Sequence, residues 1–327
     1  MMPTLGPREP DASGPASWLR RSAIFGIVFL VAGAVLYVGR RPRPLVEPQK
    51  FVVSRGSSAR QIARQLKSQG FIRSPSIFLL AVKFHPHAVL KPGVYFLSPN
   101  SGTTAYVKAF TKGPPLVRFT IPEGWTARQV ALQLEDKGIA TADVFLKKVA
   151  EKRLEGYLFP DTYFFEQESD VEKVMNRMKS RFDEMIPKDF AASAKALRLT
   201  EPQLVILASL VEREARVPEE RPVIAGVFLN RLRRHWRLES CATVEYALGQ
   251  WRPKLTYKDL EVESPYNTYR HAGLPPGPIC NPGAAALEAA SHPASTDAMF
   301  FVAEGGGTHR FSKYYAEHLA AQRRKQK

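Results

Sequence analysis

Cysteine is scarce in this chain, since only Cys241 and Cys280 occur among 327 residues. They form no C-x-x-C pair, and no histidine stands at a spacing suited to zinc, so we expect no structural metal site. In an oxidising compartment the two thiols would be able to pair as a disulfide, and two buried, unpaired thiols are the alternative. The sequence leaves both states open.

Signatures of two common function classes are also missing. The net charge of +16 comes with no zinc-finger, RNA-recognition or helix-turn-helix pattern, and the basic residues are scattered apart from clusters beside an apolar run and in the tail 323–327. We therefore expect no nucleic-acid partner and favour anionic lipid or another anionic polymer. His271, His292 and His309 have no serine or cysteine nearby in a nucleophile-elbow context, which argues against a hydrolase triad.

Long hydrophobic runs are missing with one exception. Residues 23–39 are uncharged and lie at the short end of the roughly 17 to 25 residues that cross a bilayer. No small-x-small cleavage site follows, which favours an uncleaved membrane anchor over a signal peptide. Arginines flank both ends, so the positive charges do not decide the orientation. Residues 1–22 predict a disordered leader, and residues 40–50 a linker rich in proline and arginine.

The rest of the chain has the composition of a globular protein. With 44% hydrophobic and 24% charged residues it is able to bury a core, and its length predicts two folded domains. An internal repeat stands out, because residues 56–66 recur as 124–134, 68 residues further on. Each copy follows a short β-type run, begins a helix at an N-cap residue, Ser58 or Thr126, and stops at a glycine.

The proline-rich segment 112–115 marks a domain boundary. Before it, the first repeat copy is followed by a second helix and another β-type run, which predicts a small module over residues 51–115. After it we expect a mixed α/β domain over residues 116–320, with a late β-hairpin, and a basic tail at 321–327. The fold class is therefore α+β.

A helix over residues 203–216 carries the best candidate acid. Its apolar positions recur at helical spacing and predict one buried stripe. Glu214 lies about 20° from Leu207, at the edge of that stripe, whereas Glu212 lies further away. Burial raises the pKa of a carboxyl group and keeps it protonated near neutral pH, as a general acid must be. This placement favours Glu214 over Glu212.

Three further segments offer polar and aromatic groups of the kind that carbohydrate sites use. Residues 155–163 combine a tight turn with rings and carboxylates, and residues 265–269 and 273–278 predict a rigid Pro/Gly loop that exposes amide, hydroxyl and ring groups. Two more candidates lie on the helix that follows the acid in sequence, and one lies just before that helix. The candidate substrate contacts are Glu155, Tyr157, Asp161, Tyr163, Glu220, Asn230, Arg231, Tyr266, Asn267, Thr268, Tyr269, Leu274 and Pro275.

Several of these segments, in the same order, resemble the YceG-like family of endolytic murein transglycosylases, which cut bacterial cell-wall glycan strands. They are Ala208–Ala215, Phe228–Leu232, Pro265–Tyr269 and Gly273–Pro278, joined by the segment 155–163. The resemblance implies that Glu214, the second residue of a Glu-x-Glu pair, is the only acid and base. It would first protonate the oxygen between N-acetylmuramic acid and N-acetylglucosamine. It would then accept the proton of the muramic 6-hydroxyl, leaving a 1,6-anhydro end without water or a cofactor.

The resemblance implies the surroundings as well. Residues 51–115 are similar to a LysM-like module, a type that binds N-acetylglucosamine polymers. The bulk of the chain would lie on the periplasmic or extracytoplasmic side of the inner membrane, with peptidoglycan synthases or divisome and elongasome proteins as further partners. One motif departs from the family, which often has Thr-Asp-Pro-Thr-Val where this chain has Ser240-Cys-Ala-Thr-Val244. A non-catalytic scaffold that binds peptidoglycan is the alternative function.

Overall fold

The computed structural model describes residues 47–85, 87–99, 101–250 and 255–325. The leader, the apolar run 23–39 and most of the linker lie outside the described residues. Among those that are described, no helix is long and apolar enough to cross a bilayer. Helices dominate, together with three two-stranded sheets, so the predicted α+β class is confirmed.

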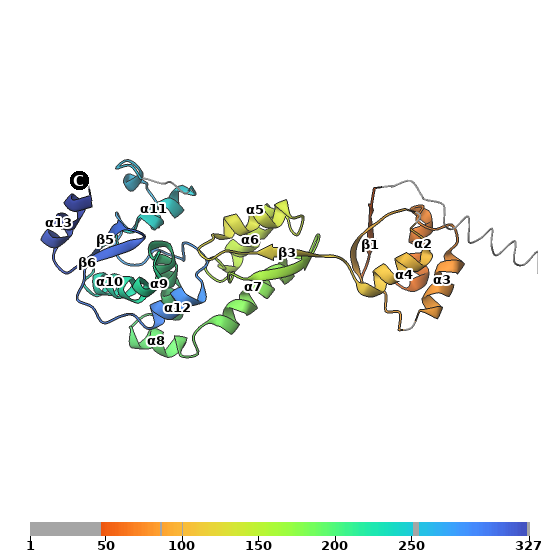
Figure 1. Ribbon diagram of the computed structural model, residues 1–327, viewed down its shortest axis with the longest axis horizontal. Helices are drawn as coiled ribbons and strands as arrows, with labels where there is room; N and C mark the ends of the chain where they lie inside the picture. The colour runs from red at the N-terminus through yellow and green to blue at the C-terminus, as the bar shows by residue number, and fades with distance from the viewer. Residues whose placement is uncertain (1–46, 86, 100, 251–254, 326–327) are drawn as a thin grey trace, which may run out of the picture. The chain divides into compact units, whose positions relative to one another are not determined.

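The described chain divides into two compact units. Residues 47–51, 56–90 and 96–111 belong to the first, and residues 52–55, 91–95 and 112–325 belong to the second. The first unit has a core of aromatic rings, in which Phe51 contacts Phe71 and Phe110 at centroid distances of 5.5 Å. The elements over residues 49–112, which Figure 1 shows, are β1 (Gln49–Val53), α2 (Ala59–Ser68), α3 (Pro75–Phe84), β2 (Gly93–Leu97) and α4 (Thr103–Lys112). Strands β1 and β2 pair into one sheet and include residues of both units.

The second unit begins with the same order of elements. These are β3 (Leu116–Thr120), α5 (Ala127–Asp136), α6 (Ala142–Lys152), β4 (Thr162–Glu166) and α7 (Val171–Met185). Strands β3 and β4 are antiparallel, with Leu116 opposite Glu166, and the helices cover a separate core that includes Phe119, Leu134 and Phe145. The repeat found over eleven residues of sequence therefore belongs to a longer β-α-α-β-α pattern that occurs twice.

The two repeat copies start and stop their helices in the same way. Ser58 and Thr126 each accept a hydrogen bond from the backbone of the glutamine three residues later, and that glutamine side chain accepts one from the cap backbone. Gly70 and Gly138, with φ of +79° and +63°, then take the left-handed conformation that glycine adopts readily. Both predicted N-caps and both glycine stops are confirmed.

The remaining elements gather around α9. Helices α8, α10, α11 and α12 all pack against it, and every residue from Leu204 to Val211 is buried. The expectation of a single buried stripe is therefore wrong, because α9 is enclosed on all sides. The elements are α8 (Phe190–Ala196), α9 (Glu201–Glu214), η1 (Pro218–Glu220), α10 (Arg221–Arg233), α11 (Cys241–Leu248), η2 (Asp259–Glu261), α12 (Ala284–Ser291), β5 (Phe300–Gly305), β6 (Thr308–Ser312) and α13 (Tyr315–Lys325).

Strands β5 and β6 form the predicted late hairpin, with Phe300 paired to Ser312 in antiparallel register. Helix α13 follows it and reaches into the segment that the sequence predicts as a basic tail.

Replacing Thr126 with alanine should lower the free energy of unfolding by roughly 1 kcal/mol, because the N-terminal amides of α5 lose their side-chain acceptor. Urea denaturation of the parent and variant proteins measures the difference. Thr126→Ser keeps the hydroxyl group and should lose much less. Equal losses in the serine and alanine variants would assign the effect to packing of the threonine methyl group instead.

Candidate functional site

Glu214 is the last residue of α9, and its carboxyl group faces the N-terminus of α11. The hydroxyl group of Ser240, the N-cap residue of α11, donates a hydrogen bond to Glu214 Oε1. The backbone amide of Ala242 acts in the same direction and lowers the pKa of the carboxyl group. A helix N-terminus favours a negative charge through its free amides and its dipole. The carboxylate form of Glu214 therefore has dedicated partners.

Burial acts on Glu214 in the opposite direction. Loss of hydration is the largest influence on its carboxyl group and raises its pKa above the usual value, while the contacts with Ser240, His309 and Arg213 lower it. Desolvation therefore stabilises the neutral form of the Glu214 carboxyl group, whereas hydrogen bonds and nearby positive groups stabilise its charged form. This is the environment that a group must have to give up a proton and then take one back.

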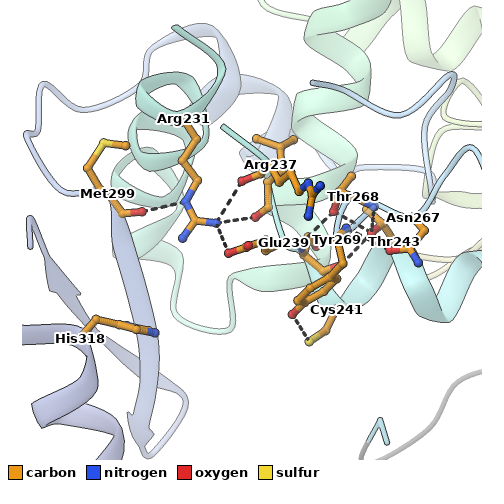
Figure 2. A network of polar contacts seen from close by, with 12 residues as sticks. Arg231, Arg237, Glu239, Cys241, Thr243, Asn267, Thr268, Tyr269, Met299 and His318 are labelled. Carbon is orange, nitrogen blue, oxygen red and sulfur yellow. Dashed lines mark hydrogen bonds and ion pairs between the residues drawn. The ribbon is translucent and has the colours of Figure 1, made fainter. Parts of the chain in front are cut away.

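Two threonines hold Ser240 in place. Its backbone amide donates to Thr268 Oγ1 at 3.0 Å, and its carbonyl oxygen accepts from Thr243 Oγ1 at 2.7 Å. The two threonine hydroxyl groups lie 2.9 Å apart, and Figure 2 shows them close together beside Tyr269. Thr268 is 1% exposed. This buried network fixes the orientation of the residue that donates to Glu214.

His309 on β6 is a neighbour of Glu214 that the sequence did not indicate. Glu220 accepts from its backbone amide at 2.8 Å and contacts its ring Nδ1 at 2.7 Å. Both side chains are largely buried, at 9% and 14% exposure. The carboxylate of Glu220, a candidate substrate contact, therefore already binds His309, the histidine near Glu214.

Glu212 is buried too, which contradicts its predicted place further from the buried face. Its side chain is 7% exposed and lies 3.9 Å from Arg221, and it accepts from the backbone amide of Gly283 at 3.0 Å. Desolvation raises its pKa as it does for Glu214. The helical wheel failed because it assumes a solvent face, which the enclosed helix α9 lacks. The partners of the two carboxyl groups distinguish them, since Glu212 ties α9 to the start of α12.

The two cysteines are both free thiols. Cys241 is exposed and its Sγ lies 3.2 Å from the hydroxyl group of Tyr269, as Figure 2 shows, whereas Cys280 is buried and contacts the carbonyl oxygen of Ser209. The structure therefore contains no disulfide between them, and the alternative of two buried thiols holds for Cys280 only. Tyr269 and Cys241 together place a phenol and a thiol near the acid.

Asn230 and Arg231, the two candidates on α10, bind backbone carbonyl groups. The amide of Asn230 donates to Thr296 and Ala298 at 2.8 and 3.1 Å. The guanidinium group of Arg231 donates to the carbonyl groups of Met299 and Leu238 at 2.7 and 2.8 Å and lies 3.6 Å from a Glu239 carboxylate oxygen. Figure 2 shows Arg231 between Met299 and Glu239. These contacts attach the strand β5 and the segment before α11 to the helix core.

The loop 265–269 is more deeply buried than expected. Asn267 is fully buried, and its amide donates to the carbonyl groups of Leu260 and Val262 at 2.9 Å. The prediction that this motif exposes its amide and hydroxyl groups is therefore wrong for Asn267 and Thr268. Tyr266 and Tyr269 are half-buried, and the ring of Tyr266 packs at a tilt against that of Tyr246, with centroids 4.8 Å apart. Their rings remain accessible in part.

Glu155 forms a second buried acid cluster, away from the partners of Glu214. Its carboxyl group accepts from the backbone amide of Ala127 at 2.9 Å, from Tyr246 at 3.3 Å and from Asn281 at 3.4 Å. Desolvation raises its pKa to about 7. Because Ala127 opens α5 and Tyr246 lies on α11, Glu155 joins the second repeat copy to the helices around α9.

The neighbouring candidates contribute to the same packing. Gly156 has a φ of +87°, and a Cβ atom there would lie 2.5 Å from Pro278, so this glycine lets the segment 155–163 contact the loop 273–278. In that loop Leu274 packs against the core around α9 and Pro275 is buried.

The last three candidates of the segment 155–163 face α7 and the adjoining chain. Asp161 accepts from Arg181 at 2.7 Å, the ring of Tyr157 lies 4.9 Å from that of Phe182, and Tyr163 donates to the carbonyl oxygen of Phe159. Tyr163 is buried, while Tyr157 and Asp161 are half-buried.

Comparison with known proteins gives an independent view of the chain. The family model for the YceG-like family matches residues 51–324. A Bacillus subtilis protein named endolytic murein transglycosylase is 33% identical over 325 residues, covering 89% of this chain and 90% of that protein. A Streptococcus pneumoniae protein of the same name is 32% identical over 77% of this chain, which spans only 53% of the pneumococcal protein.

A solved structure is similar as well. The crystal structure of a YceG-like protein from Listeria monocytogenes aligns with a TM-score of 0.57 and 33% sequence identity, covering 84% of this chain and 98% of that one.

Glu155 should make the stability of the protein depend on pH. Its pKa is about 7 in the folded state against about 4.5 when exposed, so the folded protein binds its proton more tightly and loses stability as pH rises from about 4.5 to 7. Each unit of pKa is worth about 1.4 kcal/mol. Urea denaturation across this range should show a decline in the parent that is smaller in Glu155→Gln, since Glu212 and Glu214 still contribute to it. Parallel curves for the two proteins would contradict the assignment.

Proposed function

Because the chain belongs to the YceG-like family, we propose that it acts as a lytic transglycosylase on peptidoglycan glycan strands. The observation that carries the proposal is the carboxyl group of Glu214, whose pKa desolvation raises and whose charged form the hydroxyl group of Ser240 and the N-terminus of α11 stabilise. The relatives from Bacillus and Streptococcus, named endolytic murein transglycosylases, support this reaction class.

The proposed reaction uses Glu214 twice. As a neutral acid it gives its proton to the glycosidic oxygen while the bond from that oxygen to the anomeric carbon of N-acetylmuramic acid breaks. As a carboxylate it then takes the proton of the muramic 6-hydroxyl group, whose oxygen forms the new bond to the anomeric carbon. The product has a 1,6-anhydro end, Glu214 is protonated again, and neither water nor a second carboxylate takes part.

Charge compensation in the second half of the reaction would come from residues of this chain. The Ser240 hydroxyl binds the carboxyl group directly, and the Ala242 amide and His309 both lower the pKa of Glu214. We propose His309 as a positioning residue, because Glu220 holds its backbone and its ring at the same time.

The proposed substrate contacts are two partly accessible rings, of which Tyr269 lies near Glu214 and Tyr266 lies against Tyr246. Tyr266 and Tyr269 are half-buried, and an aromatic face is suited to the C–H face of a sugar ring. Asn230, Asn267 and Thr268 would act through the loops that they hold, since their polar groups bind other parts of the protein. Tyr157 and Asp161 would extend the contact surface along the segment 155–163.

The finer assignments rest on the family resemblance. We propose that residues 51–115 are a LysM-like module, supported by the order β1-α2-α3-β2, and that the run 23–39 anchors the chain in the inner membrane with its folded part outside the cytoplasm. Peptidoglycan synthases would then be neighbours in the membrane.

Mass spectrometry of uncross-linked glycan strands tests the reaction. We expect the detergent-solubilised full chain to produce anhydro-muramic ends, and Glu214→Gln to reduce the rate by about 100- to 10,000-fold, the usual contribution of acid–base catalysis. Glu212→Gln is the matched control on the same helix and should retain most of the activity. Reducing ends would indicate hydrolysis, and strands left intact by all the folded proteins would favour a non-catalytic scaffold.

Ser240→Ala should lower kcat with little change in KM and shift the basic limb of the pH profile to higher pH. The serine hydroxyl stabilises the charged form of Glu214, so its removal raises the pKa of the acid, by about 1 unit for a hydrogen bond to a charged group. Ser240→Thr should restore the original profile. A loss of rate with an unmoved profile would mean that Ser240 only supports the local fold.

A further inference from the structure

The first unit belongs to a stretch of chain without a single acidic residue. Between Glu47 and Glu123 the sequence contains no aspartate or glutamate, although the whole chain has 31. The same stretch holds eleven basic residues, Lys50, Arg55, Arg60, Arg64, Lys67, Arg73, Lys83, Lys91, Lys108, Lys112 and Arg118. Its charge is therefore positive throughout and suits an anionic partner.

Helix α3 in this unit exposes a large apolar face. Ile77, Leu80 and Phe84 lie within about 60° of one another on the helix, and they are 59%, 55% and 75% exposed. Phe78, on another side of the helix, is fully buried in the core of the unit. Val89, a few residues later, is 68% exposed. A soluble surface rarely leaves such a cluster without a partner.

Basic residues flank this apolar face. Arg73 precedes α3, Lys83 lies on it, and both are exposed. A helix with exposed apolar side chains and adjoining lysine and arginine is able to lie in the plane of a bilayer interface, where the apolar groups enter the acyl boundary and the basic groups meet anionic headgroups. A glycan strand would meet the basic charge but would leave the apolar side chains in a polar environment, so the combination favours lipid.

We propose that the first unit docks onto an anionic membrane surface through α3, with Ile77, Leu80 and Phe84 inserted among the lipids. The eleven residues 40–50 separate the unit from the apolar run 23–39 and span at most about 40 Å when extended, so a bilayer that holds this run is within reach. The unit then lies at the headgroups rather than being held off by the linker. This inference does not depend on the proposed catalytic activity.

Lipid quenching of a fluorescent label tests the docking. The full chain carries an environment-sensitive fluorophore at Leu80→Cys in a Cys241→Ser background, and it is reconstituted into vesicles of phosphatidylglycerol and phosphatidylcholine in equal parts, or of phosphatidylcholine alone. We expect a blue shift and quenching by doxyl-labelled lipid in the anionic vesicles only. The same label at Glu151→Cys, exposed on α6, is the control and should remain in water.

Variants separate the two contributions. Arg73→Glu with Lys83→Glu should lower the ratio of docked to undocked protein by at least about fivefold for each basic residue, the factor that corresponds to about 1 kcal/mol per charge at an anionic surface. Ile77→Ser with Phe84→Ser should remove most of the quenching. Both pairs change exposed side chains, and unchanged circular dichroism and melting would show that the fold is kept.

Four results would overturn the proposal. Quenching absent from anionic vesicles, or equal at the two label positions, would mean that α3 does not enter the bilayer. A blue shift produced by soluble glycan strands without lipid would assign the face to the wall polymer. A shift that grows with protein concentration in detergent would assign it to contact between copies of the chain.

Discussion

The enclosure of α9 is the constraint on which the candidate site depends. Eight consecutive residues of this helix, Leu204 to Val211, are buried where α8, α10, α11 and α12 pack against it. The chain leaves the helix at Ala215, and Glu214 is delivered to the N-terminus of α11. The core dehydrates a carboxyl group in that position, and the N-terminus of α11 stabilises its charged form. Both halves of its proposed chemistry follow from this single placement.

The motifs around Glu214 mainly hold its binding partners in position, and fewer of their groups are free to contact a substrate. Thr268 and Thr243 orient Ser240, and Ser240 binds the acid. Asn267 stabilises the loop that carries Thr268 by binding two carbonyl groups. Polar residues that a sequence motif marks as site residues can therefore stabilise the site from inside the protein. Their buried hydrogen bonds restrict the geometry, and a rigid geometry is what a single acid and base requires.

The repeated β-α-α-β-α pattern gives the chain two similar units with different surroundings. The second copy is bound to the α9 helices by Glu155, whose carboxyl group caps α5 and contacts Tyr246 of α11. The first copy contains no acidic residue and leaves the apolar face of α3 exposed. The second copy thus helps to hold the candidate site in place, while the first copy carries the proposed docking surface. Their charges and apolar positions, rather than their topology, account for this difference.

The sequence by itself determined the α+β class, the family, both N-caps and both glycine stops of the repeat, because each depends on residues close together in the chain. It singled out Glu214 for a reason that the structure corrects, since a helical wheel cannot register a helix that is buried all round. Only the tertiary structure decided which groups meet that carboxyl group. Ser240 and His309 reach it from segments 26 and 95 residues away in sequence, and no local pattern of residues encodes contacts over such separations. Long-range packing, not local propensity, assembled the site.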